Sequence, residues 1–127
     1  MKNRVSYARV KLTRALRQLE KGVASARDRL DHDGVIQRFE FTFELLWKTL
    51  KIFLEEKGIE TKSPKDALKE AFRMGLLAKE AVYLDMLKDR NKTSHIYDER
   101  ESAKIFRRIK KKYLPEMKSL LHGLSAD

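Results

Sequence analysis

The chain has 127 residues, the length of one domain, and contains no cysteine, so disulfides, thiolate metal sites and cysteine nucleophiles are excluded. Its 29 Lys and Arg residues outnumber its 19 Asp and Glu residues, and the net charge of +10 favours polyanionic partners such as RNA. A lysine-rich, well-solvated surface would give the same excess, and both interpretations stay open.

The sequence has no apolar run long enough for a signal peptide or a membrane span. We therefore expect a cytoplasmic protein with no membrane partner. His, Asp and Glu residues nowhere show the spacing of metal ligands, so neither a metal nor another cofactor is expected. Any catalysis must then rest on side chains such as His and Arg.

The first two predicted elements are long amphipathic helices. The first has apolar residues at helical spacing, namely Val5, Leu12, Ala15, Leu16, Leu19 and Val23. Gly22 weakens it near its end, and residues 31–34 (DHDG) are interpreted as the loop that follows. The second has a wide apolar stripe, which predicts a central helix contacted on more than one side until Gly58 ends it. The stripe consists of Ile36, Phe39, Phe41, Phe43, Leu45, Leu46, Trp47, Leu50, Ile52, Phe53 and Leu54.

A capped helix start follows at residues 63–66. Ser63 suits the N-cap, Pro64 suits the first helical position, and Asp66 stands where a capping-box acid belongs. We expect this short third helix to stop at Gly75. The residues that it should bury are Ala67, Leu68, Ala71 and Phe72.

Two more helices complete the predicted fold. The fourth runs from about Lys79 to Arg90. The last starts near Asp98, which with Glu101 resembles another capping pair, and Pro115 is expected to kink or end it. Together the segments predict an all-α fold, an antiparallel helical bundle of four main helices plus one short helix. It forms a single domain over residues 1–127, with frayed ends at about 1–3 and 123–127.

The octet RNKTSHIY, residues 90–97, lies between the last two helices and has four side chains suited to chemistry: Arg90, Asn91, His95 and Tyr97. Histidine can act as a general base or acid near neutral pH, and arginine holds a phosphate through its planar fork of donors. His95 and Arg90 are therefore the smallest set of side chains that could cleave RNA without a metal. Asn91 could orient either group or bind a phosphate oxygen.

The geometry of a helix restricts this site. On an unbroken helix His95 would be displaced from Arg90 by roughly 140° around the axis. Either the helix breaks near Thr93 and Ser94, or a symmetric dimer completes the site. From spacing alone, a capping or salt-bridging role for the two residues is the ordinary explanation.

Other charged residues have structural explanations as well as functional ones. Glu44 and Lys48 on the second helix make a favourable i,i+4 pair. Trp47 is expected in the core or at a dimer interface. The densest basic patch is either a solvated helix face or a surface that guides RNA or a partner protein; it consists of Arg107, Arg108, Lys110, Lys111 and Lys112.

The octet resembles the Arg-x4-His-x-Tyr motif of HEPN-domain proteins encoded beside small MNT-type nucleotidyltransferases. This group is also known as the nucleotidyltransferase substrate-binding proteins. Two further blocks resemble the family, VIQRFEFTFELLWKTLK at residues 35–51 and SPKDALKEAFRMGLL at residues 63–77, and the resemblance covers roughly residues 34–117. It implies a HEPN helical bundle that pairs as a homodimer.

The resemblance also implies the toxin of a type II toxin–antitoxin pair. Arg90 and His95 match the catalytic residues of metal-independent ribonucleases, and Asn91 matches the polar residue after the arginine. Tyr97 matches the tyrosine that the partner nucleotidyltransferase modifies with AMP, and such a bulky anion would block the cleft. The residues expected to border that cleft are Gln37, Arg38 and Glu40. The alternatives are a non-catalytic subunit that binds or presents substrate to the nucleotidyltransferase, and a generic basic nucleic-acid-binding bundle.

Overall fold

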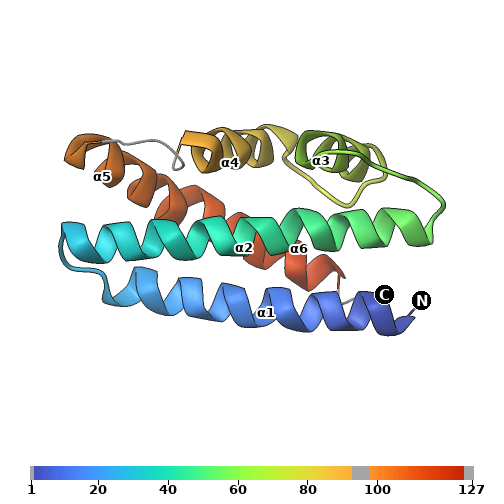
Figure 1. The fold of residues 1–127 in the computed structure, drawn as a ribbon, viewed down its shortest axis with the longest axis horizontal. Helices are drawn as coiled ribbons and strands as arrows, with labels where there is room; N and C mark the ends of the chain where they lie inside the picture. The colour runs from blue at the N-terminus through green and yellow to red at the C-terminus, as the bar shows by residue number, and fades with distance from the viewer. Residues whose placement is uncertain (1, 93–97, 125–127) are drawn as a thin grey trace.

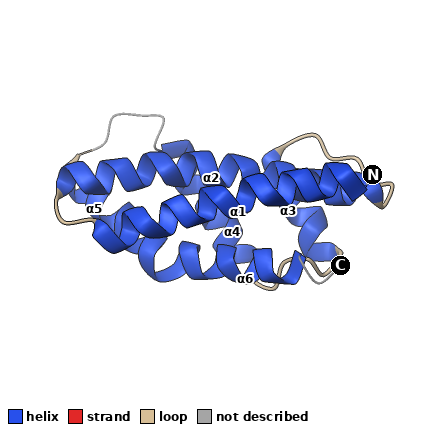
Figure 2. Ribbon diagram, turned by 90° about the horizontal axis from the view of Figure 1, so that it is seen from below, coloured by secondary structure: helices blue, strands red, loops and turns tan. Residues whose placement is uncertain are grey.

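A computed structural model of the chain describes residues 2–92 and 98–124. The elements in these ranges are α1 (Lys2–Ser25), α2 (Arg29–Glu56), α3 (Pro64–Arg73), α4 (Glu80–Lys92), α5 (Glu99–Arg108), a π-helical turn η1 (Ile109–Tyr113) and α6 (Leu114–Leu124). The last three follow one another directly and form one long helix. Within the described part Figure 2 shows helices and loops but no strand, which confirms the predicted all-α bundle.

The helix α2 is the centre of the bundle. It lies beside α1 along the whole molecule, while α3, α4 and α5 contact its other sides, and α6 reaches across to α1 (Figure 1). Six side chains of its predicted stripe are fully buried, namely Ile36, Phe39, Phe43, Leu46, Leu50 and Leu54. Phe39 also stacks on Tyr113 of η1, with ring centroids 5.5 Å apart. The wide stripe therefore predicted the central position of α2 correctly.

The helix α2 begins earlier than predicted. The Asp28 side chain accepts a hydrogen bond from the backbone N–H of Asp31 (3.0 Å), and Asp31 in turn accepts one from the backbone N–H of Arg27 (2.8 Å). The arrangement resembles a capping box, except that Asp31 binds the N–H of the residue before the N-cap. Residues 31–34 therefore belong to the first turns of α2, and the loop predicted there is wrong. In the structure the loop between α1 and α2 is the short segment 26–28.

The other predicted caps are confirmed. Ser63 Oγ accepts from the N–H of Asp66 at 3.1 Å, and Asp98 accepts from the N–H of Glu101 at 2.8 Å. Gly58 and Gly75 follow α2 and α3 with φ of 82° and 79°, the left-handed conformation that suits glycine at a helix end.

One expectation about the core differs from the structure, and one of the two alternatives for Pro115 is excluded. Phe72, predicted to be buried, is 43% exposed, because it lies at the edge of the buried face of the short α3. Pro115 does not end the last helix. The N–H of Leu114 bonds to the carbonyl of Ile109, five residues back, and this wide turn makes room for the proline ring that follows. The helix then continues through Gly123 to Leu124, which is buried.

Candidate active site around Arg90

Arg90 lies in the last turn of α4, which ends at Lys92. The next described residue, Asp98, has extended backbone dihedrals and begins α5 as its N-cap. α4 and α5 are thus two separate helices, and the break predicted near residues 93 and 94 falls on a segment that the structure does not describe. His95 and Tyr97, together with Thr93 and Ser94, lie outside the described residues.

The Arg90 guanidinium is bound to the central helix. Its Nη2 lies 2.8 Å from Oε2 of Glu44, whose Oε1 lies 3.7 Å from Nζ of Lys48. The expected Glu44–Lys48 pair is thus present, but Glu44 has a second, closer partner on α4. The Arg90 side chain is 36% exposed, so an incoming phosphate can still reach it. Asn91 is exposed, and its Oδ1 lies 3.4 Å from Arg90 Nη1, at the long limit of a hydrogen bond.

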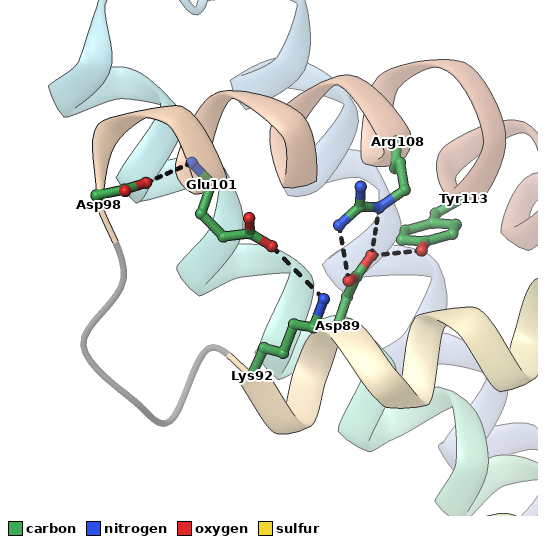
Figure 3. Close-up of polar contacts among 6 residues, drawn as sticks. All are labelled: Asp89, Lys92, Asp98, Glu101, Arg108 and Tyr113. Atoms are coloured by element: carbon green, nitrogen blue, oxygen red, sulfur yellow. Dashed lines mark hydrogen bonds and ion pairs between the residues drawn. The ribbon is translucent and has the colours of Figure 1, made fainter.

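The neighbour of Arg90, Asp89, forms a buried ionic network. Arg108 donates to both of its carboxylate oxygens, from Nε at 2.7 Å and from Nη2 at 2.8 Å, and the Tyr113 hydroxyl donates to Oδ2 at 2.5 Å (Figure 3). Such a bidentate pair is strong and directional. It fastens the end of α4 to the long C-terminal helix. Arg108 is thereby separated from the other four residues of the basic patch, which are exposed: Arg107, Lys110, Lys111 and Lys112.

Two groups of this network have pKa values raised by their surroundings, Arg108 and Tyr113. The hydrogen bonds from Arg108 to Asp89 raise the pKa of the guanidinium above its usual value. Burial, and after it the hydrogen bond to Asp89, raises the pKa of the Tyr113 hydroxyl, so that this group stays protonated and remains a donor. Arg108 and Tyr113 therefore both remain hydrogen-bond donors to Asp89.

A second contact joins the same two helices. Lys92 Nζ lies 3.5 Å from Glu101 Oε1, and the backbone N–H of Glu101 is the group that Asp98 caps (Figure 3). The C-terminal end of α4 and the N-terminal end of α5 are thus held together on both sides of residues 93–97.

The residues predicted to border the cleft occupy different sides of α2. Arg38 faces α1, where its Nη1 donates to the carbonyl oxygen of Gln18 at 2.9 Å. Gln37 is exposed, and Glu40 is half-buried one turn before Glu44. Of the acids on this part of α2, it is Glu44 that the structure brings to Arg90.

Three residues around Arg90 received no role in the site from the sequence: Glu44, Asp89 and Tyr113. The role of Asp89 could have been predicted from the sequence. It follows the buried Tyr83 and Met86 at helical spacing, and an acid on an apolar helix face indicates a buried partner. The contact of Glu44 with Arg90 could not have been predicted, because the i,i+4 pair with Lys48 already accounts for an acid at this position. Its other partner is 46 residues away in the sequence.

In residues 2–92 and 98–124, no three or more His, Asp or Glu side chains gather closely enough to hold a metal ion. Over the same ranges, no helix is both long and apolar enough to cross a bilayer. Of the residues predicted to be catalytic, the described part of the site contains the Arg90 cation and its neighbour Asn91.

Comparison with known proteins identifies the family. Residues 9–126 match the family model described as "Nucleotidyltransferase substrate binding protein like". Over 84 residues the chain is 39% identical to a Haemophilus influenzae protein named "Probable ribonuclease HepT", and this match covers 60% of the chain and 56% of that relative.

Solved structures share the fold over nearly their full length. A crystal structure of a protein from Thermus thermophilus has a TM-score of 0.76 at 34% identity, covering 91% of this chain and 96% of the other. A Haemophilus influenzae protein, described as revealing the fold of a substrate binding domain of a nucleotidyltransferase, has a TM-score of 0.70 at 28% identity, covering 97% and 98%. These matches confirm the resemblance first indicated by the octet and the two helical blocks. The chain belongs to the nucleotidyltransferase substrate binding protein-like family of HEPN proteins.

Proposed function

We propose that this protein is a metal-independent ribonuclease, the toxin of a type II pair whose antitoxin is an MNT-type nucleotidyltransferase. The observation that carries the proposal is the placement of Arg90. Its partly exposed guanidinium is held by Glu44 at the very end of α4, five residues before His95. The similarity to a protein named ribonuclease HepT supports the reaction class.

Cleavage would proceed by transesterification. His95 takes the proton from a ribose 2′-hydroxyl, the 2′ oxygen attacks the adjacent phosphorus, and the 5′ oxygen of the next nucleotide leaves with a proton. Arg90 stabilises the charge that builds up on the phosphoryl oxygens, and Asn91 binds or orients one of them. The products are a 2′,3′-cyclic phosphate and a free 5′-hydroxyl.

Tyr97 would be the point of control. The nucleotidyltransferase transfers AMP from ATP to its hydroxyl, and pyrophosphate leaves. The added anion lies two residues from His95 and offsets the positive charge of Arg90, so that RNA is repelled. Intact-mass analysis of the protein co-expressed with its partner would show the AMP group, and Tyr97→Phe should lose it.

Two substitutions test the proposed reaction. We expect Arg90→Ala and His95→Ala each to lower cleavage of labelled RNA by about 100-fold or more and to relieve growth inhibition, while the helical circular dichroism stays unchanged. The assay contains EDTA because no metal is needed. Arg73→Ala, at an exposed arginine paired with Glu70 on α3, is the matched control and should cut normally. The site assignment is wrong if both site variants cut like the wild type.

One observation favours a second function. The Glu44 carboxylate, 2.8 Å from Arg90, already neutralises the cation that should clamp a phosphate. If this pair is purely structural, the protein is a non-catalytic subunit that binds substrate for the nucleotidyltransferase. Glu44→Gln keeps a hydrogen-bond acceptor for Arg90 but removes the competing charge, so a true nuclease should keep or increase its cleavage. Wild-type protein that leaves varied RNAs intact, yet binds the nucleotidyltransferase tightly, would favour the subunit.

A further inference from the structure

Four basic side chains form a stripe on the solvent side of the long C-terminal helix. They are Arg100, Lys104, Arg107 and Lys111, and we name them the α5 ridge. Their spacing of four, three and four residues places them on one helix face, and all four are exposed. The buried residues of the same helix, Ser102, Ile105 and Ile109, lie on the other side.

Arg100 lies among the acids Asp98, Glu99 and Glu101, but beyond it the charge of the α5 ridge is not balanced by acids of the same helix. Residues 102–115 contain six Lys or Arg and no Asp or Glu. The carboxylates that other helices direct at this segment bind to its core side: Asp89 holds Arg108, and Asp33 accepts a hydrogen bond from the buried Ser102 at 2.7 Å. Among the described residues no ion pair involves a ridge side chain, whereas cations such as Lys118 and Arg73 have carboxylate partners.

The α5 ridge passes alongside the candidate site. Asp89, the residue before Arg90, binds Arg108, which is next to Arg107 of the ridge, and Lys92 lies 3.5 Å from Glu101, which is next to Arg100 (Figure 3). Arg100 is two residues after Asp98, the N-cap of α5. From there the helix runs toward the middle of the molecule (Figure 1). Eleven residues of helix rise about 16 Å, the length of roughly five nucleotides in a stacked strand. A strand with one phosphate at Arg90 would therefore have its neighbouring phosphates within reach of the ridge.

We propose that the α5 ridge binds the sugar–phosphate backbone of the RNA that is cleaved at Arg90. The choice of RNA as the polyanion rests on the proposed function, while the surface itself rests on spacing, exposure and charge. Lysine and arginine contacts to phosphates position a strand without reading its bases. The ridge therefore supplies affinity and register, and it leaves the choice of cleavage sequence to other parts of the protein.

The test compares two triple variants with the same net charge. Lys104→Gln, Arg107→Gln and Lys111→Gln neutralise the ridge, and the matched control replaces three other exposed cations, Lys62, Lys65 and Lys69, by Gln. Both are made in the His95→Ala background, and the probe is a fluorescein-labelled single-stranded RNA of about 20 nucleotides, chosen to exceed the roughly five that the ridge spans. A plot of log affinity against log salt concentration has a negative slope, to which each phosphate contact contributes about 0.7. We expect the magnitude of this slope to fall by about 2 in the ridge variant, which lacks three such contacts, and to change little in the control. At about 0.15 M salt that loss corresponds to a tens-of-fold weaker complex.

Three other outcomes are decisive. Equal weakening of both variants would show general attraction to a basic protein and would overturn the proposal. A ridge variant that keeps its RNA affinity but no longer binds the nucleotidyltransferase would assign the ridge to that protein partner, which also overturns it. Selective loss of RNA binding, together with wild-type protein that cuts no RNA, would support the ridge and contradict only the ribonuclease activity.

Discussion

At the scale of single residues, Asp89 is the most constrained group near the site. It is the one charged residue among the buried residues of the described ranges. A buried carboxylate is tolerated only when its oxygens are hydrogen-bonded and its charge is paired. Here Arg108 pairs with the charge, and Arg108 and Tyr113 both donate hydrogen bonds to the oxygens. Because Arg90 is the next residue, the same contacts also fix the backbone that carries the proposed catalytic arginine.

We expect Asp89→Ala to lower the free energy of unfolding by about 2–4 kcal/mol, since it leaves the Arg108 guanidinium partly buried without its carboxylate. Urea unfolding followed by circular dichroism measures the loss. The control is Glu20→Ala, which removes an ion pair with Lys118 on the surface and should cost less than about 1 kcal/mol. Equal losses in the two variants would mean that the buried network contributes no more than a surface pair.

At the scale of helices, two glycines of the α1–α2 pair have opposite surroundings. A Cβ at Gly22 of α1 would lie 2.9 Å from Nη1 of Arg38 and 3.3 Å from Cγ2 of Val35. This glycine thus allows α2 to approach closely and leaves space for the Arg38 hydrogen bond to Gln18. At Gly34, in the first turns of α2, nothing lies within 4 Å of an added Cβ.

Gly34→Ala should therefore stabilise the protein by about 0.5–1 kcal/mol, because alanine loses less backbone entropy when a helix forms. Gly22→Ala gains the same helix preference but displaces Arg38, so we expect no net stabilisation. Thermal unfolding of the two variants side by side gives the comparison. If Gly34→Ala is the less stable of the two, residues 31–34 are not helical in solution.

The sequence was most informative where a helix is determined by its own residues. The apolar stripe predicted the position of α2, and Ser63 and Asp98 predicted two helix starts, because caps and stripes act over three or four residues. The wrong predictions concern residues whose structure depends on more distant neighbours. Glycine and acids at residues 31–34 resemble a turn until Asp28 is seen to cap the helix before them. Arg108 resembles a surface cation until Asp89, on another helix, is seen beside it.

At the scale of the whole molecule, the groove between α1 and α2 presents an apolar surface to solvent. It has a volume of about 490 Å³, and its apolar lining includes Phe41 and Leu45. Phe41 is 62% exposed although it belongs to the central helix. It also precedes Glu44 by three residues, so a partner covering it would lie next to the Arg90 site. We propose that the homodimer expected from the family uses this face.

Light scattering on the purified protein should then give about twice the 15.0 kDa mass of one chain. Phe41→Lys places a charge in the buried apolar centre of that contact and should shift the protein toward monomer. Phe72→Lys, at a phenylalanine on α3 that is 43% exposed, is the matched control and should leave the mass unchanged. A wild-type protein that stays monomeric at every concentration would rule this interface out.

The π-helical turn η1 has a consequence for how the chain can change in length. Its hydrogen bond from Leu114 to Ile109 spans five residues, one more than in an α-helix. Loss of one residue among 110–112 would return the turn to α-helical geometry and leave the residues before and after it on their present faces. A deletion further along α6 would instead rotate every later residue by about 100° and carry Leu120 and Leu124 out of the core. The three lysines therefore mark the place where evolution can insert or remove a residue in this helix, and relatives of different length should differ there.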